Sequence, residues 1–451
     1  MQMNKRTPGF AGVPIFHQIG ETILSTMKIE QIFDKSIDSY GGLHFFHKFI
    51  DKSGLNRVFD QVLGNRPAQA EFSYVDIFSS FAATCLAGGT YMEDMNILKK
   101  KNNSDTRYRY CSSDTFARVS NQLVDLENME LQYTQADKEV ELFYNEPLNR
   151  LLQQTYKLFF AEQANHILDH DHTKILNNKP DARACYKGLG YYVSCFSTDQ
   201  IPVYLSMQSG NATPKTNLVE VLEAGFQAMK KQRLSFEIFR ADGACYSEEV
   251  IKLILLYCKD YIVRSRRSHV RQDLINPEEC SMIDIRGELY RIFEHTDTFA
   301  GKPCRRIYYQ KMNGEKDLFS EITFDEIITS ISQDQYSTVE LIEMYFDRGA
   351  SERIFDEIKN DYNGCHLPYK EAPYNLCYIL FCALSLTVVR AFKVLVHEKV
   401  GPYIQPKMRI KRILFRLISF PAKLIRRSRQ VFYKIYCKQK ELVPLFAWAD
   451  S

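Results

Sequence analysis

Apolar side chains recur every three or four residues through the first third of the chain. The segments GGLHFFHKFIDKSGLNRVF and SYVDIFSSFAATCLAGG both show this spacing, which is typical of amphipathic helices. Nothing in this part of the chain has the spacing of a catalytic motif. We therefore predict an all-α N-terminal domain over residues 1–150.

The pattern changes near residue 163, where β-branched and aromatic residues dominate short segments bounded by turn residues. The predicted elements, in order, are strands at 165–173, 189–196 and 201–208, a helix at 214–232, a strand at 234–242, a helix at 247–258 and a strand at 260–265. A further helix begins at Ser337. We expect an α/β domain built from residues 160–267 and 336–398.

Residues 268–335 interrupt this domain with short strands, so they predict a β-rich insertion. ELYRIFEHT and CRRIYYQKM are expected to pair antiparallel, and Asn313-Gly314 favours a tight hairpin turn. After the insertion, the longest apolar run, Leu376 to Val389, covers 14 residues. A membrane span needs about 20 residues, so we expect a buried core helix within residues 374–396.

The segment 337–363 opens with a capping box, Ser-x-x-Glu, and this predicts one continuous helix. One face of that helix carries, at offsets 0, +3, +7 and +14, the side chains of Tyr345, Arg348, Glu352 and Lys359. At about 100° per residue they fall within a stripe of roughly 60°. Such a stripe does not face an apolar core; it is either a functional surface or a solvated face with ion pairs. Asp356 lies on the same stripe and is an alternative to Glu352.

The spacing Tyr-x2-Arg-x3-Glu-x6-Lys resembles the signature of DDE transposases of bacterial insertion sequences, the cut-and-paste group with an RNase H-like catalytic core. The resemblance implies that Glu352 is the third metal-binding carboxylate and that Tyr345, Arg348 and Lys359 contact DNA. It also implies a fold, in which an RNase H-like core places its first strand beside its fourth and is interrupted by the β-rich insertion. The preceding helical domain would recognise the ends of the element.

Two aspartates complete the expected set: Asp171 on the first predicted strand and Asp242 at the end of the fourth. Asp171 is preferred over Asp169, on the same face of that strand, because the family shows Asp-x-Thr here and Asp171-His-Thr173 fits. Oxygen ligands of this kind suit two Mg²⁺ ions, with Mn²⁺ as a substitute. Two such ions support phosphodiester displacement. The resemblance therefore implies metal-dependent DNA end cleavage and strand transfer of an insertion sequence.

Other interpretations stay open. LDHDHT resembles the Asp-x-Asp-x-Thr strand of haloacid-dehalogenase-like phosphatases, in which Asp169 would be the nucleophile and Asp171 the general acid. A domesticated transposase that only binds DNA is a non-enzymatic alternative. His170 and His172 form a His-x-His pair that can bind a metal, but they point away from the aspartates, so packing roles are expected.

The net charge is only +3, but it is unevenly distributed. Residues 390–440 hold 15 Lys and Arg against one acid, Glu398, and this local charge of +14 indicates a polyanionic partner. The predicted basic C-terminal tail, residues 399–451, supplies as candidate DNA-backbone contacts Arg409, Arg412, Arg426 and Arg427. The alternatives are a solvated amphipathic helix and a helix on a membrane surface.

The expected partners are double-stranded DNA, as terminal inverted repeats and target, and a second copy of the chain assembled on that DNA. No membrane partner is expected. The N-terminus shows no signal peptide, and the 12 Cys form no regular framework, so we expect a cytoplasmic, nucleoid-associated location in a bacterium. No phosphate-binding Gly-rich loop occurs in the sequence, and nucleotide binding is not expected.

Overall fold

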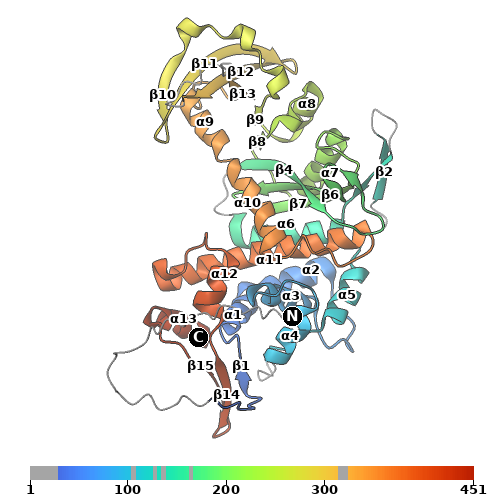
Figure 1. Ribbon diagram of the computed structural model, residues 1–451, viewed down its shortest axis with the longest axis vertical. Helices are drawn as coiled ribbons and strands as arrows, with labels where there is room; N and C mark the ends of the chain where they lie inside the picture. The colour runs from blue at the N-terminus through green and yellow to red at the C-terminus, as the bar shows by residue number, and fades with distance from the viewer. Residues whose placement is uncertain (1–28, 103–107, 125–128, 134–138, 162–165, 313–323) are drawn as a thin grey trace, which may run out of the picture. The chain divides into compact units, whose positions relative to one another are not determined.

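A mixed sheet of 12 strands organises the chain (Figure 1). The computed structural model describes residues 29–102, 108–124, 129–133, 139–161, 166–312 and 324–451. The strand order is β10-β11-β12-β13-β9-β8-β4-β6-β7-β3-β2, with β5 (Arg183–Cys185) paired to β6 alone. Within this order the central strands β4, β8 and β9 run parallel, and the other neighbours pair antiparallel.

The centre of the sheet confirms the expected pairing of the first and fourth strands. β4 (Ile167–Leu176) lies between β6 (Gly188–Thr198) and β8 (Ile238–Ala241), and β8 in turn pairs with β9 (Asp260–Arg264). His170 is opposite Ala241 in the parallel register. The residue after each of these two is an aspartate, so Asp171 and Asp242 lie at neighbouring positions.

Helices cover this part of the sheet. An apolar cluster joins its strands, including β7 (Ile201–Ser209), to α7 (Leu218–Lys231) and α8 (Glu248–Tyr257). Both helices lie within segments predicted to be helical, and Ser247 caps α8 by accepting a hydrogen bond from the backbone of Val250.

The predicted β-rich insertion contains β10 (Ser281–Ile285), β11 (Glu288–Phe299), β12 (Lys302–Lys311) and β13 (Asp325–Thr329). β11 and β12 pair antiparallel, as their sequence pattern predicts. β13 pairs with β9, so the insertion extends the central sheet instead of forming a separate one. The predicted Asn313-Gly314 turn lies outside the described residues.

The N-terminal region was predicted to be all-α, but it also contains strands. It contains α1 (Leu43–Ser53), α2 (Leu55–Leu63), α3 (Tyr74–Leu86), α4 (Asp94–Lys101) and α5 (Ser113–Gln122). Then β2 (Met129–Tyr133) and β3 (Glu139–Phe143) form a hairpin, and β3 joins the sheet beside β7. The reason is a period of two in EVELF, where Val140 and Leu142 are buried and Glu139 is exposed.

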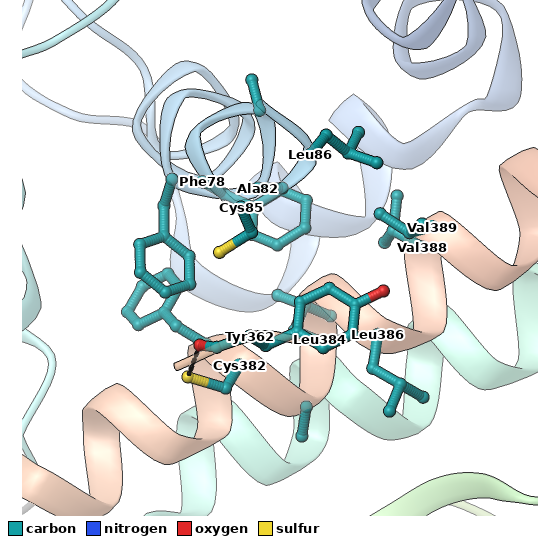
Figure 2. Packing of buried hydrophobic residues seen from close by; sticks show 14 of the residues in the cluster. Phe78, Ala82, Cys85, Leu86, Tyr362, Cys382, Leu384, Leu386, Val388 and Val389 are labelled. Carbon is teal, nitrogen blue, oxygen red and sulfur yellow. Dashed lines mark hydrogen bonds between the residues drawn. The ribbon is translucent and has the colours of Figure 1, made fainter. Parts of the chain in front are cut away.

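One long helix, α11 (Ala372–Val400), packs the N-terminal helices against the sheet. Its apolar side chains contact α3, α5, β7 and α6 (Glu146–Phe160), and 83% of its most apolar stretch is buried. Figure 2 shows Phe78, Ala82 and Leu86 of α3 close to α11, where the Cys382 thiol donates a hydrogen bond to the Tyr362 carbonyl at 3.0 Å. α11 is long and apolar enough to cross a membrane, but its burial confirms the predicted core helix.

The predicted single helix over 337–363 is divided in two. α9 (Thr338–Phe346) begins at the Ser337 capping box as predicted, and α10 (Gly349–Asn360) follows after Asp347 and Arg348. At the break, Arg348 and Ala350 donate backbone hydrogen bonds three residues back, to Tyr345 and Asp347. Glycine destabilises a helix interior, and Gly349 lies at this break. The four signature residues are therefore not carried by one continuous helix.

The basic C-terminal segment is folded, not a tail. After α12 (Ile410–Ile413), β14 (Ala422–Arg427) and β15 (Gln430–Ile435) form a hairpin, β1 (Ile37–Asp38) adds a third strand, and α13 (Val443–Asp450) ends the chain. Ile404, Ile413 and Leu417 are buried in the same apolar cluster as the N-terminal helices. The alternative of one long amphipathic helix is therefore wrong.

Candidate functional site

Asp171 and Asp242 come together at one edge of the central strands. Asp171 is on β4, and Asp242 follows β8, where its carboxylate caps a short turn by accepting a hydrogen bond from the Ala244 backbone at 2.9 Å. Burial raises the pKa of the Asp171 carboxyl, and the neighbouring Asp242 adds to the rise, whereas Arg348 opposes it. The two carboxylates are therefore close enough to interact electrostatically.

The Arg348 guanidinium lies among the predicted carboxylates. Its Nη1 atom is 3.5 Å from Oδ2 of Asp171, and its Nη2 atom is 3.8 Å from Oε1 of Glu352. Its charge also interacts with Asp242 and with the phenol of Tyr345. One mostly shielded cation, with its side chain 13% exposed, thus interacts with all three members of the predicted carboxylate set.

Glu352 differs from the two aspartates in its exposure. It lies in the first turn of α10, and its side chain is 71% exposed, whereas that of Asp171 is 14% exposed. Within the described part of the chain, no three Asp, Glu, His or Cys side chains are close enough together to hold a metal ion. The carboxylates fit a hard cation chemically, because all three are oxygen donors and they already surround a positive group.

The two other signature residues occupy different environments. Tyr345 is buried, and that burial raises its pKa while the charge of Arg348 opposes the rise. Lys359 is half-buried, and its Nζ atom donates a hydrogen bond to Oγ1 of Thr173 at 2.6 Å. The signature lysine therefore contacts the strand that carries Asp171.

The alternative carboxylates are held by other partners. Asp169 is buried and accepts two hydrogen bonds from Arg240, at 2.6 and 2.8 Å. Asp356 is ion-paired with Arg409 and accepts a hydrogen bond from Asn360 at 2.6 Å. Both groups are therefore less available to a ligand than Asp171 and Glu352.

The His-x-His pair packs on the other side of β4. The Nε2 atom of His170 is 2.8 Å from Oγ of Ser194, and that of His172 is 3.1 Å from the Pro214 carbonyl. Burial lowers the pKa of His170 well below its ordinary value. A neutral, hydrogen-bonded His170 is what a packing role requires.

The candidate DNA contacts in the C-terminal segment are not equivalent. Arg409 is ion-paired with Asp356 and Asp361, so its charge is partly used inside the protein. Arg412, Arg426 and Arg427 are exposed. The two last residues lie at the end of β14, far in sequence from the signature helix.

A pocket of about 420 Å³ beside Arg348 was missed by the sequence reasoning. Its wall combines α9 with the insertion and includes Arg264, Tyr290, Tyr309 and Lys311. Two of these residues are aromatic and two are cationic. No local motif marks them, because they meet only through the pairing of β13 with β9.

Comparisons with known protein families and solved structures identify similar proteins. The family described as Transposase DDE domain group 1 matches residues 22–443. A solved structure of the piggyBac transposase synaptic complex with hairpin DNA is similar at a TM-score of 0.41, with 11% identity over 83% of this chain and 79% of that one. No curated protein sequence matches the chain significantly. Because the family match covers nearly the whole sequence, the chain belongs to the DDE transposases of domain group 1.

Proposed function

We propose that the protein cuts DNA at the ends of an insertion sequence and joins the freed ends to target DNA. The observation that carries this proposal is the position of Asp171 and Asp242 on adjacent parallel strands, with Arg348 bridging them to Glu352. The strand order β9-β8-β4-β6-β7 supports an RNase H-like core, as the resemblance implies.

In this proposal Asp171, Asp242 and Glu352 would hold two Mg²⁺ ions, or Mn²⁺ in their place, and the exposed Glu352 side chain would have to turn toward the two aspartates. Bound divalent ions supply an activated attacking oxygen and stabilise the leaving oxygen. Arg348 and Tyr345 hold the phosphate of the cut strand, since a guanidinium presents a fork of donors to phosphate oxygens. Lys359 adds a second cation on the same side.

The exposed cations Arg412, Arg426 and Arg427 would contact the backbone of the duplex, whereas Arg409 first positions α10 through Asp356. The partner is double-stranded DNA, with two copies of the chain assembled on the paired ends. The phosphatase alternative is weaker, because its nucleophile would be Asp169, which Arg240 holds in a buried ion pair.

The test uses a duplex with the terminal inverted repeat from the DNA that flanks the gene, in Mg²⁺. Asp171→Ala, Asp242→Ala and Glu352→Ala should each abolish end cleavage with unchanged melting temperature. Glu249→Ala, which removes an exposed carboxylate on α8, is the control and should cut normally. Cleavage that survives Glu352→Ala but not Asp356→Ala would show that the third carboxylate is Asp356 and not Glu352. A wild-type protein that binds this duplex without ever cutting it would favour the domesticated alternative.

A further inference from the structure

The β14–β15 hairpin combines a fixed base with an exposed, cationic tip. At the base, Ala422 is buried and pairs with Asp38 of β1, and the Tyr433 hydroxyl donates a hydrogen bond to Oδ2 of Asp38 at 2.9 Å. From Arg426 to Phe432 every side chain is exposed. Figure 1 shows the two strands running side by side with β1 and extending away from the helices that hold them.

The charge of this hairpin has one sign. Between residues 422 and 435 the chain has five cations and no acid: Lys423, Arg426, Arg427, Arg429 and Lys434. Strand alternation places Arg427 and Lys423 on the face opposite the one that packs through Tyr433. The outer face and the tip therefore complement a polyanion.

The turn at the tip is unusual in composition. Arg427 pairs with Gln430, which leaves a loop of two residues, Ser428 and Arg429, with φ of 52° and 62°. Positive φ at both central residues favours Asn-Gly or a similar pair, because a β-carbon is disfavoured there. The sequence places a long cationic side chain where glycine would cost least.

Other two-residue hairpins in the described part of the chain differ in the residue at the second loop position. The β5–β6 turn has Lys187 there, exposed and with a φ of 82°, so a cation at a left-handed position is not confined to β14–β15. The β10–β11 and β11–β12 turns have glycine second, at Gly287 and Gly301. The β6–β7 turn has Gln200 there, but Arg390 donates a hydrogen bond to its carbonyl and so stabilises that turn from outside. Arg429 is exposed. What distinguishes the β14–β15 tip is that its left-handed cation adjoins Arg426 and Arg427 in a run of exposed side chains, and this concentration of positive charge points to an anionic ligand.

We propose that this hairpin inserts its tip into the major groove of double-stranded DNA, with Arg429 reaching the base edges and Arg426 and Arg427 on the flanking phosphates. A two-stranded β-ribbon fits the major groove, and an arginine there pairs with the O6 and N7 atoms of guanine. The hairpin then contributes base recognition, beyond the backbone contacts expected of a basic segment. This inference rests on the proposed action on DNA.

The sharpest variant replaces the turn with its preferred residues, Ser428→Asn together with Arg429→Gly. Asn-Gly favours this turn, so the melting temperature should stay the same or rise while the arginine is lost. The matched control is Lys438→Gln, which removes one exposed charge from the same basic segment outside the hairpin. Affinity is measured by fluorescence anisotropy with a short guanine-containing duplex and with the same duplex carrying 7-deazaguanine, which lacks the N7 acceptor.

Wild-type protein and Lys438→Gln should bind the 7-deazaguanine duplex about tenfold more weakly than the ordinary one. The turn variant should bind both duplexes equally, at the weaker level. Equal binding of both duplexes by wild type, or unchanged binding by the turn variant, would overturn the inference. The inference would also be overturned if the turn variant kept its affinity for both duplexes but lost affinity for anionic phosphatidylglycerol vesicles, since that result would assign the tip to a membrane. The readout is binding, so it is separate from the cleavage test: Asp171→Ala should abolish cutting but keep this discrimination.

Discussion

The Nη1 atom of Arg348 lies 3.5 Å from Oδ2 of Asp171, yet it donates no hydrogen bond within the described residues. A buried guanidinium nitrogen without a hydrogen bond is costly, so the atom is available to an acceptor brought by a ligand. A phosphate oxygen of the DNA end is such an acceptor. In the free protein the same guanidinium instead neutralises the carboxylates.

Removing that guanidinium should therefore favour metal binding. Arg348→Ala is expected to bind Mn²⁺ at least about tenfold more tightly than wild type in the absence of DNA, because a positive charge close to Asp171 repels a dication. Calorimetric titration with Mn²⁺ near pH 8 measures this, since burial raises the pKa of Asp171 and protons compete at lower pH. Unchanged Mn²⁺ affinity would show that the charge of Arg348 does not oppose metal binding at these carboxylates.

Arg348→Lys is the matched variant, because it keeps the positive charge and loses the planar fork. Its Mn²⁺ affinity should stay near that of wild type, while end cleavage falls by about tenfold or more. A variant that cuts DNA as wild type does would show that the side chain acts only as a charge on a solvated face.

Much of the site was predictable because its residues lie within short segments. The Asp-x-Thr strand and the signature spacing are local patterns, and the family resemblance that they carry implied Asp171 and Glu352. Periodicity also predicted the strand that carries Asp171 and the strand that Asp242 follows. The parallel pairing of those strands also came from the family resemblance, since periodicity alone does not choose strand neighbours.

The errors have a common physical cause, which is contact between segments distant in sequence. The hairpin β14–β15 pairs with β1 nearly 400 residues earlier in the chain, and no local signal shows that pairing. Buried residues such as Ile413 and Leu417 anchor the C-terminal segment in the core. Truncation after Val400 would expose that core, so point variants are the appropriate test of its basic residues.

The Asp169–Arg240 pair should matter for stability more than for chemistry. Asp169→Asn leaves the Arg240 guanidinium buried without a counter-charge, which is expected to cost about 3–5 kcal/mol of unfolding free energy. The double variant Asp169→Leu with Arg240→Met should recover most of that loss. Urea unfolding measures both. A phosphatase activity that disappears in Asp169→Asn without a stability change would restore the rejected alternative.

Lys393 should make stability depend on pH. Its Nζ atom donates a hydrogen bond to the Met408 carbonyl at 2.9 Å, and burial lowers its pKa from 10.5 to about 8, although Glu357 opposes this. Between these two pKa values the unfolded chain is protonated and the folded protein is not, so the stability of wild type rises with pH there. Relative to Lys393→Met, wild type should gain about 3 kcal/mol from pH 7 to 10.5. The exposed Lys411→Met is the control, and a parallel pH profile for wild type and Lys393→Met would contradict the prediction.

Variants of Lys359 and its partner can distinguish a structural anchor from a DNA contact. Its Nζ atom is 2.6 Å from Oγ1 of Thr173, so it either fixes α10 to β4 or exchanges that hydroxyl for a phosphate when DNA binds. We expect the exchange, because a phosphate carries the charge that a hydroxyl lacks. Thr173→Val removes the acceptor at similar volume and should leave affinity for a pre-cleaved end duplex unchanged. Lys359→Met should weaken it by about tenfold and reduce the slope of affinity against salt by about one phosphate contact. Both affinities are measured by titration over a range of salt concentrations. An equal loss in the two variants, with an unchanged salt slope, would show that Lys359 is an anchor between helix and strand and does not contact DNA.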